Sequence, residues 1–483
     1  MPESPFERIL NARSVAFFGA SNNPAKMGSM QMVHLVQDDF KGKVWPIHPK
    51  EKEVMGRPAY ARVEDLPEVP DLAVLVLPTQ IVPEMLEACG RKGIRRAVII
   101  SGGFRERGPE GRRLEDQVVE IARRYGIRFV GPNCVGVIHA ARNFNITVYP
   151  YTLGPGPMGL LSQSGTYVTQ VLMYVARQGI RYSQAVSLGN EADLDMVDGI
   201  EYLGQDPETK AIALYIEGIG RGRAFLETAR RVSLKKPLVA YYVGGTEAGA
   251  RSGASHTGKM GGNDRIHDHL FRQCGVLRAP SVEALYDWAW ALATTPIPKG
   301  DRVAIISHSG GPVTSMADAC ARLGLKVPTF SPKTQAAIAP MLPSTGSTAN
   351  PVDLTYNRNP GAMTGGIPKA VFASGEVDAF LIHGLGGMSG SGVVGASAAA
   401  TIGLSPDQIK AFAELSNQGL IELKQDLSCP VVISTFSDPT DAGVSHAMRH
   451  DIPVYPTPER AASALAALVR YGRWRAGQKV AQA

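Results

Sequence analysis

Short apolar runs alternate along the chain with longer segments of mixed apolar and charged residues. Ten of these runs are rich in Val, Ile and Leu, and each is followed by a segment typical of a helix. Buried parallel strands connected by helices produce this alternation, so the pattern predicts an α/β protein built from parallel sheets. The predicted strands span residues 14–21, 72–78, 95–104, 127–133, 158–165, 211–218, 236–245, 302–311, 378–384 and 429–435.

The residues at the ends of these strands indicate where a ligand binds, and two breaks in the series of strands indicate domain boundaries. Most of the predicted strands end in Gly, Ser or Asn, which leaves room for a ligand at the carboxyl edge of an open sheet. Breaks rich in Gly and Pro occur at residues 149–157 and 294–300. A chain of 483 residues also suggests roughly three domains. We therefore predict three consecutive domains with doubly wound parallel sheets, over residues 1–150, 151–296 and 301–475.

The second and third predicted domains open in the same way. Residues 160–172 (LLSQSGTYVTQVL) and 305–317 (IISHSGGPVTSMA) share a strand, a Ser-x-Ser-Gly turn and a helix start, which favours duplicated layers. The serines can cap the helices, and the N–H groups of a helix start also attract phosphate, so the turns serve either role or both. A serine hydrolase is not indicated, because serine replaces the first glycine of G-x-S-x-G before Ser164 and Ser309.

The composition is that of an ordinary globular protein. Hydrophobic residues make up 44% and charged residues 19% of the chain, and the net charge of +6 is scattered rather than gathered in a basic run. Nucleic-acid binding is therefore not favoured, whereas a small anionic ligand is compatible. The five cysteines include no CxxC pair, so neither a disulfide framework nor a metal site is predicted. The charged start and the lack of a long apolar run predict a cytoplasmic protein without a membrane segment.

A Gly-rich loop at residues 17–28 (FFGASNNPAKMG) connects the first strand to a helix, and the N–H groups of such a helix start suit a pyrophosphate. Gly19 is present, but the later glycines of the dinucleotide fingerprint are not, which makes NAD less suitable. The next strand leads to Lys50, where an NAD site places an acid; a cation there suits a ribose that carries a phosphate, as in coenzyme A. The alternative is that Lys26 and Lys50 are solvated surface lysines.

The loop at residues 251–262 (RSGASHTGKMGG) holds one histidine among small residues. An accessible imidazole in a glycine-dense loop suits a phosphoryl carrier, although a lone histidine is more often structural or merely exposed. A neutral His256 can attack a phosphoryl group, and a carboxylate that accepts its second N–H stabilises the charge that develops. Glu217, at the end of the strand at 211–218, can face this loop; the alternative is an ordinary surface glutamate.

Taken in order, these motifs closely resemble those of the ADP-forming acetyl-CoA synthetases and their relatives, the succinyl-CoA synthetases. The resemblance runs over nearly the whole chain, through VAFFGAS, GPNCVGV (131–137), LLSQSGT, SLGNEADLD (187–195), YIEGI, SHTGKMGG and NPVDLT (350–355). It implies the alpha-type subunit, with a Rossmann-like CoA-binding domain followed by two related flavodoxin-like ligase domains. The first ligase domain would carry a phosphorylated histidine.

The resemblance also implies roles for individual residues. His256 would be phosphorylated, and Glu217 would be the carboxylate that steadies it. The phosphate would rest at the two turns, on Gln163, Ser164, Gly165, Ser309, Gly310 and Gly311. The coenzyme A site would comprise Gly19, Ser21, Lys26, Pro49, Lys50, Pro78, Ser101, Gly102, Phe104, Asn133 and Cys134. The last two would lie near the reacting thiol, but Cys134 is not expected to be a nucleophile because the family reaction uses an acyl phosphate.

The implied reaction is reversible and needs a second protein. A small carboxylic acid, CoA and ATP give acyl-CoA, ADP and phosphate, through an acyl phosphate and a phosphohistidine. The sequence contains no ATP-grasp domain, so the resemblance implies an ATP-grasp beta-type partner that binds ADP or ATP with Mg²⁺, in an α2β2 hetero-oligomer. Lys259 and Met260 replace alanines common after SHTG, and Val135 follows GPNC in place of Leu or Pro. These departures bear on the choice of acid rather than on the reaction.

Two other functions fit parts of the sequence. A CoA-binding regulatory or scaffold protein would share the first domain but would not turn over a substrate. An NAD(P)-dependent oxidoreductase would share the opening strand, loop and helix, but the fingerprint glycines are missing. Phosphorylation of His256 distinguishes the synthetase from both.

Overall fold

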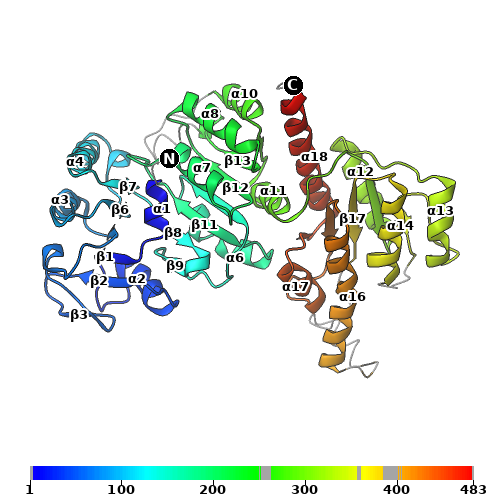
Figure 1. Cartoon of the computed structure of the whole chain (residues 1–483), viewed down its shortest axis with the longest axis horizontal. Coiled ribbons are helices and arrows are strands. Elements are labelled where there is room, and N and C mark those ends of the chain that lie inside the picture. Colours follow the sequence, from blue (N-terminus) through cyan, green and yellow to red (C-terminus); the bar gives the residue numbers. More distant parts are fainter. Residues whose placement is uncertain are drawn as a thin grey trace. The chain divides into compact units, whose positions relative to one another are not determined.

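The computed structural model describes residues 4–249, 251, 263–355, 361–384, 401, 403 and 405–480. The chain forms two compact units, Met1–Met173 with Arg181–Ala279 and Tyr174–Ile180 with Pro280–Ala483. The described residues build three sheets of five or more strands (Figure 1), which confirms the predicted α/β class with parallel sheets. No helix in these described ranges is both long and apolar enough to cross a membrane.

The first sheet has the strand order β2-β1-β5-β6-β7, and all its strands are parallel. Its apolar strands are covered by helices on both faces, as parallel sheets require. Phe17 packs with Leu35 of α2 in one core, and Phe18 packs with Leu86 of α3 in another. The elements are α1 (Pro5–Leu10), β1 (Ser14–Phe18), α2 (Met27–Gln37), β2 (Lys43–Ile47), the hairpin of β3 (Glu53–Val54) and β4 (Arg57–Pro58), β5 (Leu72–Leu75), α3 (Val82–Lys92), β6 (Arg96–Ile99), α4 (Pro109–Tyr125) and β7 (Arg128–Val130).

The second sheet has the order β14-β13-β12-β10-β11-β8-β9. Residues 137–145, which precede the predicted boundary at residue 150, join this sheet because β8 pairs antiparallel with β11 and β9 pairs with β8. The other strands are parallel. The elements are β8 (Val137–His139), β9 (Phe144–Asn145), β10 (Met158–Ser162), α5 (Thr166–Thr169), α6 (Leu172–Arg177), β11 (Tyr182–Ser187), α7 (Met196–Gln205), β12 (Ala211–Ile216), α8 (Gly222–Ser233), β13 (Leu238–Tyr242), α10 (Asp264–Cys274) and β14 (Val276–Arg278).

The third sheet, in the second unit, has the order β16-β15-β17-β18-β19 and is parallel throughout. Its elements are β15 (Val303–Ser307), α12 (Gly310–Arg322), α13 (Pro332–Ile338), β16 (Val352–Asp353), α14 (Ile367–Ser374), β17 (Ala379–His383), α16 (Pro406–Asp426), β18 (Val431–Ser434), α17 (Ala442–Arg449), β19 (Val454–Tyr455) and α18 (Pro458–Val480).

Helix α11 (Val282–Thr294) precedes the predicted boundary at residue 296, yet it packs in the second unit. The guanidinium of Arg460 on α18 holds the buried carboxylate of Asp287 through two hydrogen bonds of 2.8 Å. The indole N–H of Trp288 donates to Ser463 at 3.0 Å. A charge-assisted bidentate pair and this polar contact therefore attach α11 to the C-terminal helix.

All ten predicted strands are present, each shorter than its apolar run because the final small residues turn into loops. Strand β11 (YSQAVS) escaped the sequence pattern because three of its six residues are polar, although all six are buried. The hydroxyl of Ser183, for example, lies 2.7 Å from the hydroxyl of Thr209, which belongs to the segment before β12.

Candidate functional site

The loop after β1 is held close to the end of β5. Gly19 has a φ of 94°, and a Cβ at this position would overlap the carbonyl oxygen of Val76, so only glycine fits. The backbone N–H of the buried Ser21 donates to the hydroxyl of Ser29 at 3.0 Å, and that hydroxyl donates to the Ser21 carbonyl at 2.8 Å. These bonds attach the loop to the first turn of α2, which lies at the carboxyl edge of the sheet where open α/β folds bind ligands.

The predicted cations of the CoA site, Lys26 and Lys50, are both exposed, as is Pro49. The loops that carry them are connected, because the side-chain amide of Asn22 donates to Glu51 at 2.6 Å. The backbone N–H of Glu51 also donates to Nδ1 of His48 at 2.9 Å. The structure therefore brings the loops after β1 and β2 together.

The loops after β5, β6 and β7 are also joined. The Ser101 hydroxyl accepts from the N–H of Leu77 at 2.9 Å and donates to the carbonyl of Leu77 at 2.7 Å, immediately before the exposed Pro78. The backbone N–H of Asn133 donates to the Ser101 carbonyl at 2.9 Å, and Gly102 lies against the Asn133 side chain. The side chain of Phe104 is fully buried in the core, so this residue can shape the site but cannot offer its ring to a ligand.

Cys134 sits at the base of the loop after β7. Its thiol donates to the carbonyl of Ile99 at 3.4 Å, and burial raises the pKa of the thiol to about 12. The group is therefore protonated near neutral pH, and a protonated thiol is a weak nucleophile. This environment agrees with the expectation that Cys134 does not attack the substrate.

A polar network that the sequence did not reveal connects the first two sheets. The side-chain amide of Asn133 donates to Asn190 at 3.2 Å, and the amide of Asn190 donates to Glu106 at 2.7 Å and to Glu115 at 2.9 Å. Burial opposes ionisation of Glu106, but the bonds from Asn190 and from the N–H groups of Gly103 and Phe104 outweigh it and lower its pKa. Asn190 belongs to the SLGNEADLD motif, and it was missed because it follows the unrecognised strand β11.

The first Ser-x-Ser-Gly turn is organised around the buried side chain of Gln163. Its amide nitrogen donates to Glu191 and to the carbonyl of Gly218, each at 2.8 Å. Its oxygen accepts from the N–H groups of Glu217 at 2.6 Å and Gly218 at 3.0 Å. The carboxamide thus holds the backbone of Glu217 at the end of β12, and its hydrogen-bonding groups face the protein.

The first turn also meets the loop after β7. Ser164 and Gly165 are half-buried, and a Cβ at Gly165 would overlap a methyl group of Val135. The N–H of Val135 donates at 3.1 Å to the hydroxyl of Ser187, the first residue of the motif that contains Asn190. Asn133 and Cys134, predicted to lie near the CoA thiol, therefore belong to the same loop whose Val135 contacts Gly165, a residue predicted to bind the phosphate.

Glu217 is half-buried beside two stacked tyrosines. The rings of Tyr167 and Tyr215 are 4.0 Å apart, and Tyr215 pairs with Tyr241 of β13. Burial first, and then the negative charge of Glu217, raise the pKa of Tyr215 above its usual value. The carboxylate therefore acts electrostatically at the carboxyl edge of the second sheet.

The second Ser-x-Ser-Gly turn belongs to the other unit. The N–H of Ser309 donates to the Ser307 hydroxyl at 3.0 Å, and Gly310 begins α12 near a carboxylate oxygen of Asp353. Gly311 borders open space. His256 lies outside the described residues, so this part of the predicted site is not placed.

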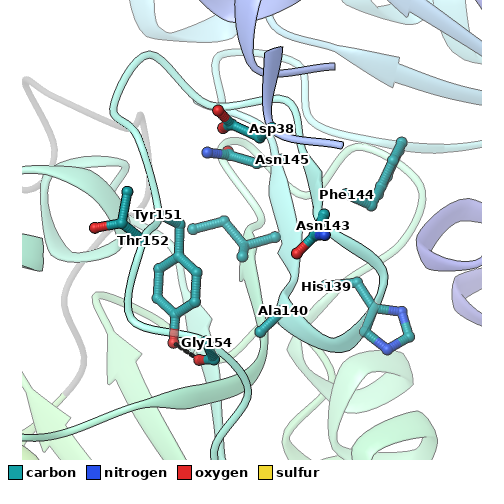
Figure 2. A pocket seen from close by; sticks show the side chains of 10 residues that line it. Asp38, His139, Ala140, Asn143, Phe144, Asn145, Tyr151, Thr152 and Gly154 are labelled. Carbon is teal, nitrogen blue, oxygen red and sulfur yellow. Dashed lines mark hydrogen bonds between the residues drawn. The ribbon is translucent and has the colours of Figure 1, made fainter. Parts of the chain in front are cut away.

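A cavity of about 290 Å³ lies beside β8 and β9 and contains none of the predicted site residues (Figure 2). The Tyr151 hydroxyl donates to the carbonyl of Gly154 at 3.0 Å. The Asn145 amide donates to the carbonyl of Tyr149 at 2.9 Å. Burial lowers the pKa of His139, whose Nδ1 lies 3.2 Å from the Leu10 carbonyl. These polar groups support the local backbone.

Family models match two parts of the chain. The CoA binding domain matches residues 13–140, and the succinyl-CoA ligase like flavodoxin domain matches residues 155–292. The alpha subunit of an ADP-forming acetate–CoA ligase of Pyrococcus furiosus is 37% identical, over 98% of this chain and 99% of the relative.

Two further relatives extend this likeness. An ADP-forming acetate–CoA ligase of Archaeoglobus fulgidus is 40% identical over 72% of this chain, a match that spans 50% of that relative. The solved dinucleotide-forming acetyl-coenzyme A synthetase 1 of Candidatus Korarchaeum cryptofilum, in complex with phosphate and ADP, has a TM-score of 0.86 and 34% identity. That likeness covers 99% of both chains.

Proposed function

The chain belongs to the family of ADP-forming acyl-CoA synthetases, as a subunit of the alpha type, and we propose that it transfers phosphate through His256. It is a CoA-binding subunit of an acid–thiol ligase, which converts an acid, CoA and ATP into acyl-CoA, ADP and phosphate. Neither the scaffold nor the oxidoreductase alternative is favoured by these relatives.

The contact between the first turn and the loop after β7 is the observation that carries the proposal. Gly165 lies against Val135, directly after Asn133 and Cys134, so a thioester held at the first sheet would reach the helix start at the turn. The positive end of a helix favours phosphate at that place. The CoA site would include the residues predicted above at the carboxyl edge of the first sheet.

The proposed chemistry consists of three successive displacements. A phosphate oxygen attacks the thioester carbonyl of acyl-CoA, the C–S bond breaks, and the thiolate leaves and takes up a proton. The imidazole of His256 then attacks phosphorus, the bond from phosphorus to the acyl oxygen breaks, and the carboxylate leaves. The phosphohistidine passes its phosphoryl group to ADP, and the reverse sequence consumes ATP.

Glu217 would stabilise the charge that develops on the imidazole of His256. Support comes from the neighbouring strands β12 and β13: Glu217 follows β12, and the chain leaves β13 before it reaches His256. The carboxylate would accept the second ring N–H, as in other histidine–carboxylate pairs. The helix starts at Ser164 and Ser309 would each provide a binding site for the phosphoryl group during its transfer.

The nucleotide would bind on an ATP-grasp subunit of the beta type, in an α2β2 assembly. Support comes from the relative of Archaeoglobus fulgidus, half of which lies outside the match and offers room for such a domain. We further propose that each of the three large sheets marks one domain, with the first boundary before β8 and the second before α11, and that the enzyme works in the cytoplasm.

Labelling of His256 tests this function. The chain is incubated with its partner subunit and ATP labelled on the γ-phosphate, and acid-labile label is mapped by peptide analysis. His256→Asn is expected to bind CoA normally but to lose both the label and synthetase activity. His269→Asn, which changes an exposed histidine on α10, is the matched control and should retain both. Synthetase activity in His256→Asn would refute the assignment.

A further inference from the structure

An arginine-rich cavity lies at the end of the first sheet opposite the CoA site. Arg13, Asp71 and Arg95 immediately precede β1, β5 and β6, which are adjacent parallel strands, so they mark the amino edge of the sheet. The cavity has a volume of about 650 Å³, within the range of small-molecule sites. It is lined by Glu7, Arg8, Asn11, Arg13, Val69, Pro70, Asp71, Gly93, Arg95, Arg96 and Arg142.

Positive charge dominates this cavity, since five guanidinium groups share it with two carboxylates. Both carboxylates already accept hydrogen bonds: Asp71 from the backbone N–H of Arg13 at 2.9 Å, and Glu7 from the Asn11 amide at 2.9 Å. Among the described residues, Arg13, Arg95 and Arg142 form no salt bridge. Clustered like charges repel one another, and a bound anion would relieve that repulsion.

Two of the arginines are held in place by the protein. Arg95 donates through one terminal nitrogen to the carbonyls of Gly90 at 3.0 Å and Ile94 at 3.2 Å. Arg142 donates to the Asn11 side chain at 3.3 Å. Each guanidinium carries five N–H donors, so further donors remain for a ligand in a restrained geometry.

We propose that this cavity binds an anion with two or more phosphate groups, of the size of a nucleoside diphosphate or triphosphate. A guanidinium group can bind two phosphate oxygens at once, so a cluster of arginines can form several such pairs with one polyphosphate. Val69, which is 51% exposed, and the adjacent Pro70 offer an apolar edge against which a nucleoside can pack. The site is separate from the CoA site, because the two lie at opposite edges of one sheet.

Titration of the full-length chain with tripolyphosphate tests the proposal. Binding is followed by calorimetry in the presence of saturating CoA, for wild type, for the double variant Arg13→Gln/Arg142→Gln, and for Arg112→Gln/Arg113→Gln. The last is a matched control that removes the same charge from an exposed face of α4. We expect the first double variant to raise the dissociation constant for tripolyphosphate about tenfold or more, and the control to change it less than about twofold.

The affinities of the variants distinguish a nucleotide site from a polyphosphate site and from a subunit contact. Tighter binding of ATP than of tripolyphosphate, lost in the first double variant alone, would identify a nucleotide as the ligand; equal binding would identify the phosphate chain as sufficient. Equal weakening in both double variants, or no saturable binding to wild type, would overturn the proposal. If the first double variant bound tripolyphosphate as wild type does but no longer associated with the partner subunit, the proposal would be overturned and the cavity would be a subunit contact. Thermal unfolding and the affinity for CoA check that each variant is folded.

Discussion

The two Ser-x-Ser-Gly turns share a local structure but differ in the contacts of the side chain between their serines. Each follows a strand inside its sheet, β10 or β15, and each leads into a helix. In each, the hydroxyl of the first serine bonds within the turn: Ser162 donates to the Ser164 carbonyl at 2.6 Å, and Ser307 accepts from the Ser309 N–H at 3.0 Å. The serines that the two motifs share therefore form hydrogen bonds within the turn.

The residue between the serines makes the difference. Gln163 is buried, and its amide holds the backbone of Glu217. His308 lies instead against Gly384, where a Cβ would overlap its ring, and the buried His383 precedes that glycine. One motif therefore builds two turns that each lead into a helix, whereas only the first turn has an amide that positions the backbone of a glutamate.

Removal of that carboxylate is expected to have the largest effect. In Glu217→Gln, a neutral amide cannot stabilise a positive imidazole, so phosphorylation of His256 should slow on the order of 100-fold. The pKa of Tyr215 should fall, because the charge of Glu217 helps to raise it. Quench-flow labelling and ultraviolet titration of the tyrosines measure the two effects. Glu227→Gln, an exposed change on α8, is the control; wild-type labelling rates with a lowered tyrosine pKa would argue against the catalytic role of Glu217.

Substitution inside the turns should have the next largest effect. Gln163→Met keeps the length of the side chain but leaves the N–H groups of Glu217 and Gly218 without their acceptor. A loss of about 1–3 kcal/mol in the free energy of unfolding is expected for buried groups left unsatisfied, with about a tenfold loss of activity. Denaturant unfolding and steady-state assays measure both. His308→Gln should change activity less than about threefold; an equal loss in the two variants would remove the proposed distinction between the turns.

The smallest expected effect is a pH dependence of the second unit that comes from His383, the last residue of β17. Burial, and then the charge of His308, lower the pKa of His383 from 6.5 to about 4. Between pH 6.5 and about 4, the unfolded chain binds a proton that native His383 does not, so stability falls as the pH falls. Above pH 6.5 this contribution is fully present.

Thermal unfolding of the second unit from pH 7.5 to pH 4.5 measures this dependence. His383→Gln should flatten it, whereas His450→Gln, which replaces an exposed histidine in the same unit, should leave it unchanged. The first turn carries Gln163, which does not titrate, and its variants should show no such change in slope. A slope that is identical in wild type and His383→Gln would show that His383 does not contribute.

Much of the fold was predictable because the signals are local. Apolar runs located ten strands, and β11 was missed because three of its six residues are polar; one of them, Ser183, has its hydrogen-bond partner in Thr209, 26 positions away. Likewise, Gly19 was recognisable from its place after β1, whereas the burial of Phe104 depends on helices elsewhere in the chain. The family resemblance supplied candidate site residues, and it did not indicate the network through Asn190.

The alternation of strand and helix, the small residues at the carboxyl edge of the sheets and the two serine turns could all be predicted from the sequence alone. The folded arrangement places the side chain of Gln163 against the backbone of Glu217, 54 positions away, and Val135 against Gly165. It also gathered Arg13, Arg95 and Arg142 around one cavity. Periodicity and turn chemistry act between near neighbours in the sequence, whereas a side chain contacts a distant partner only after the order of the strands has set which loops lie together.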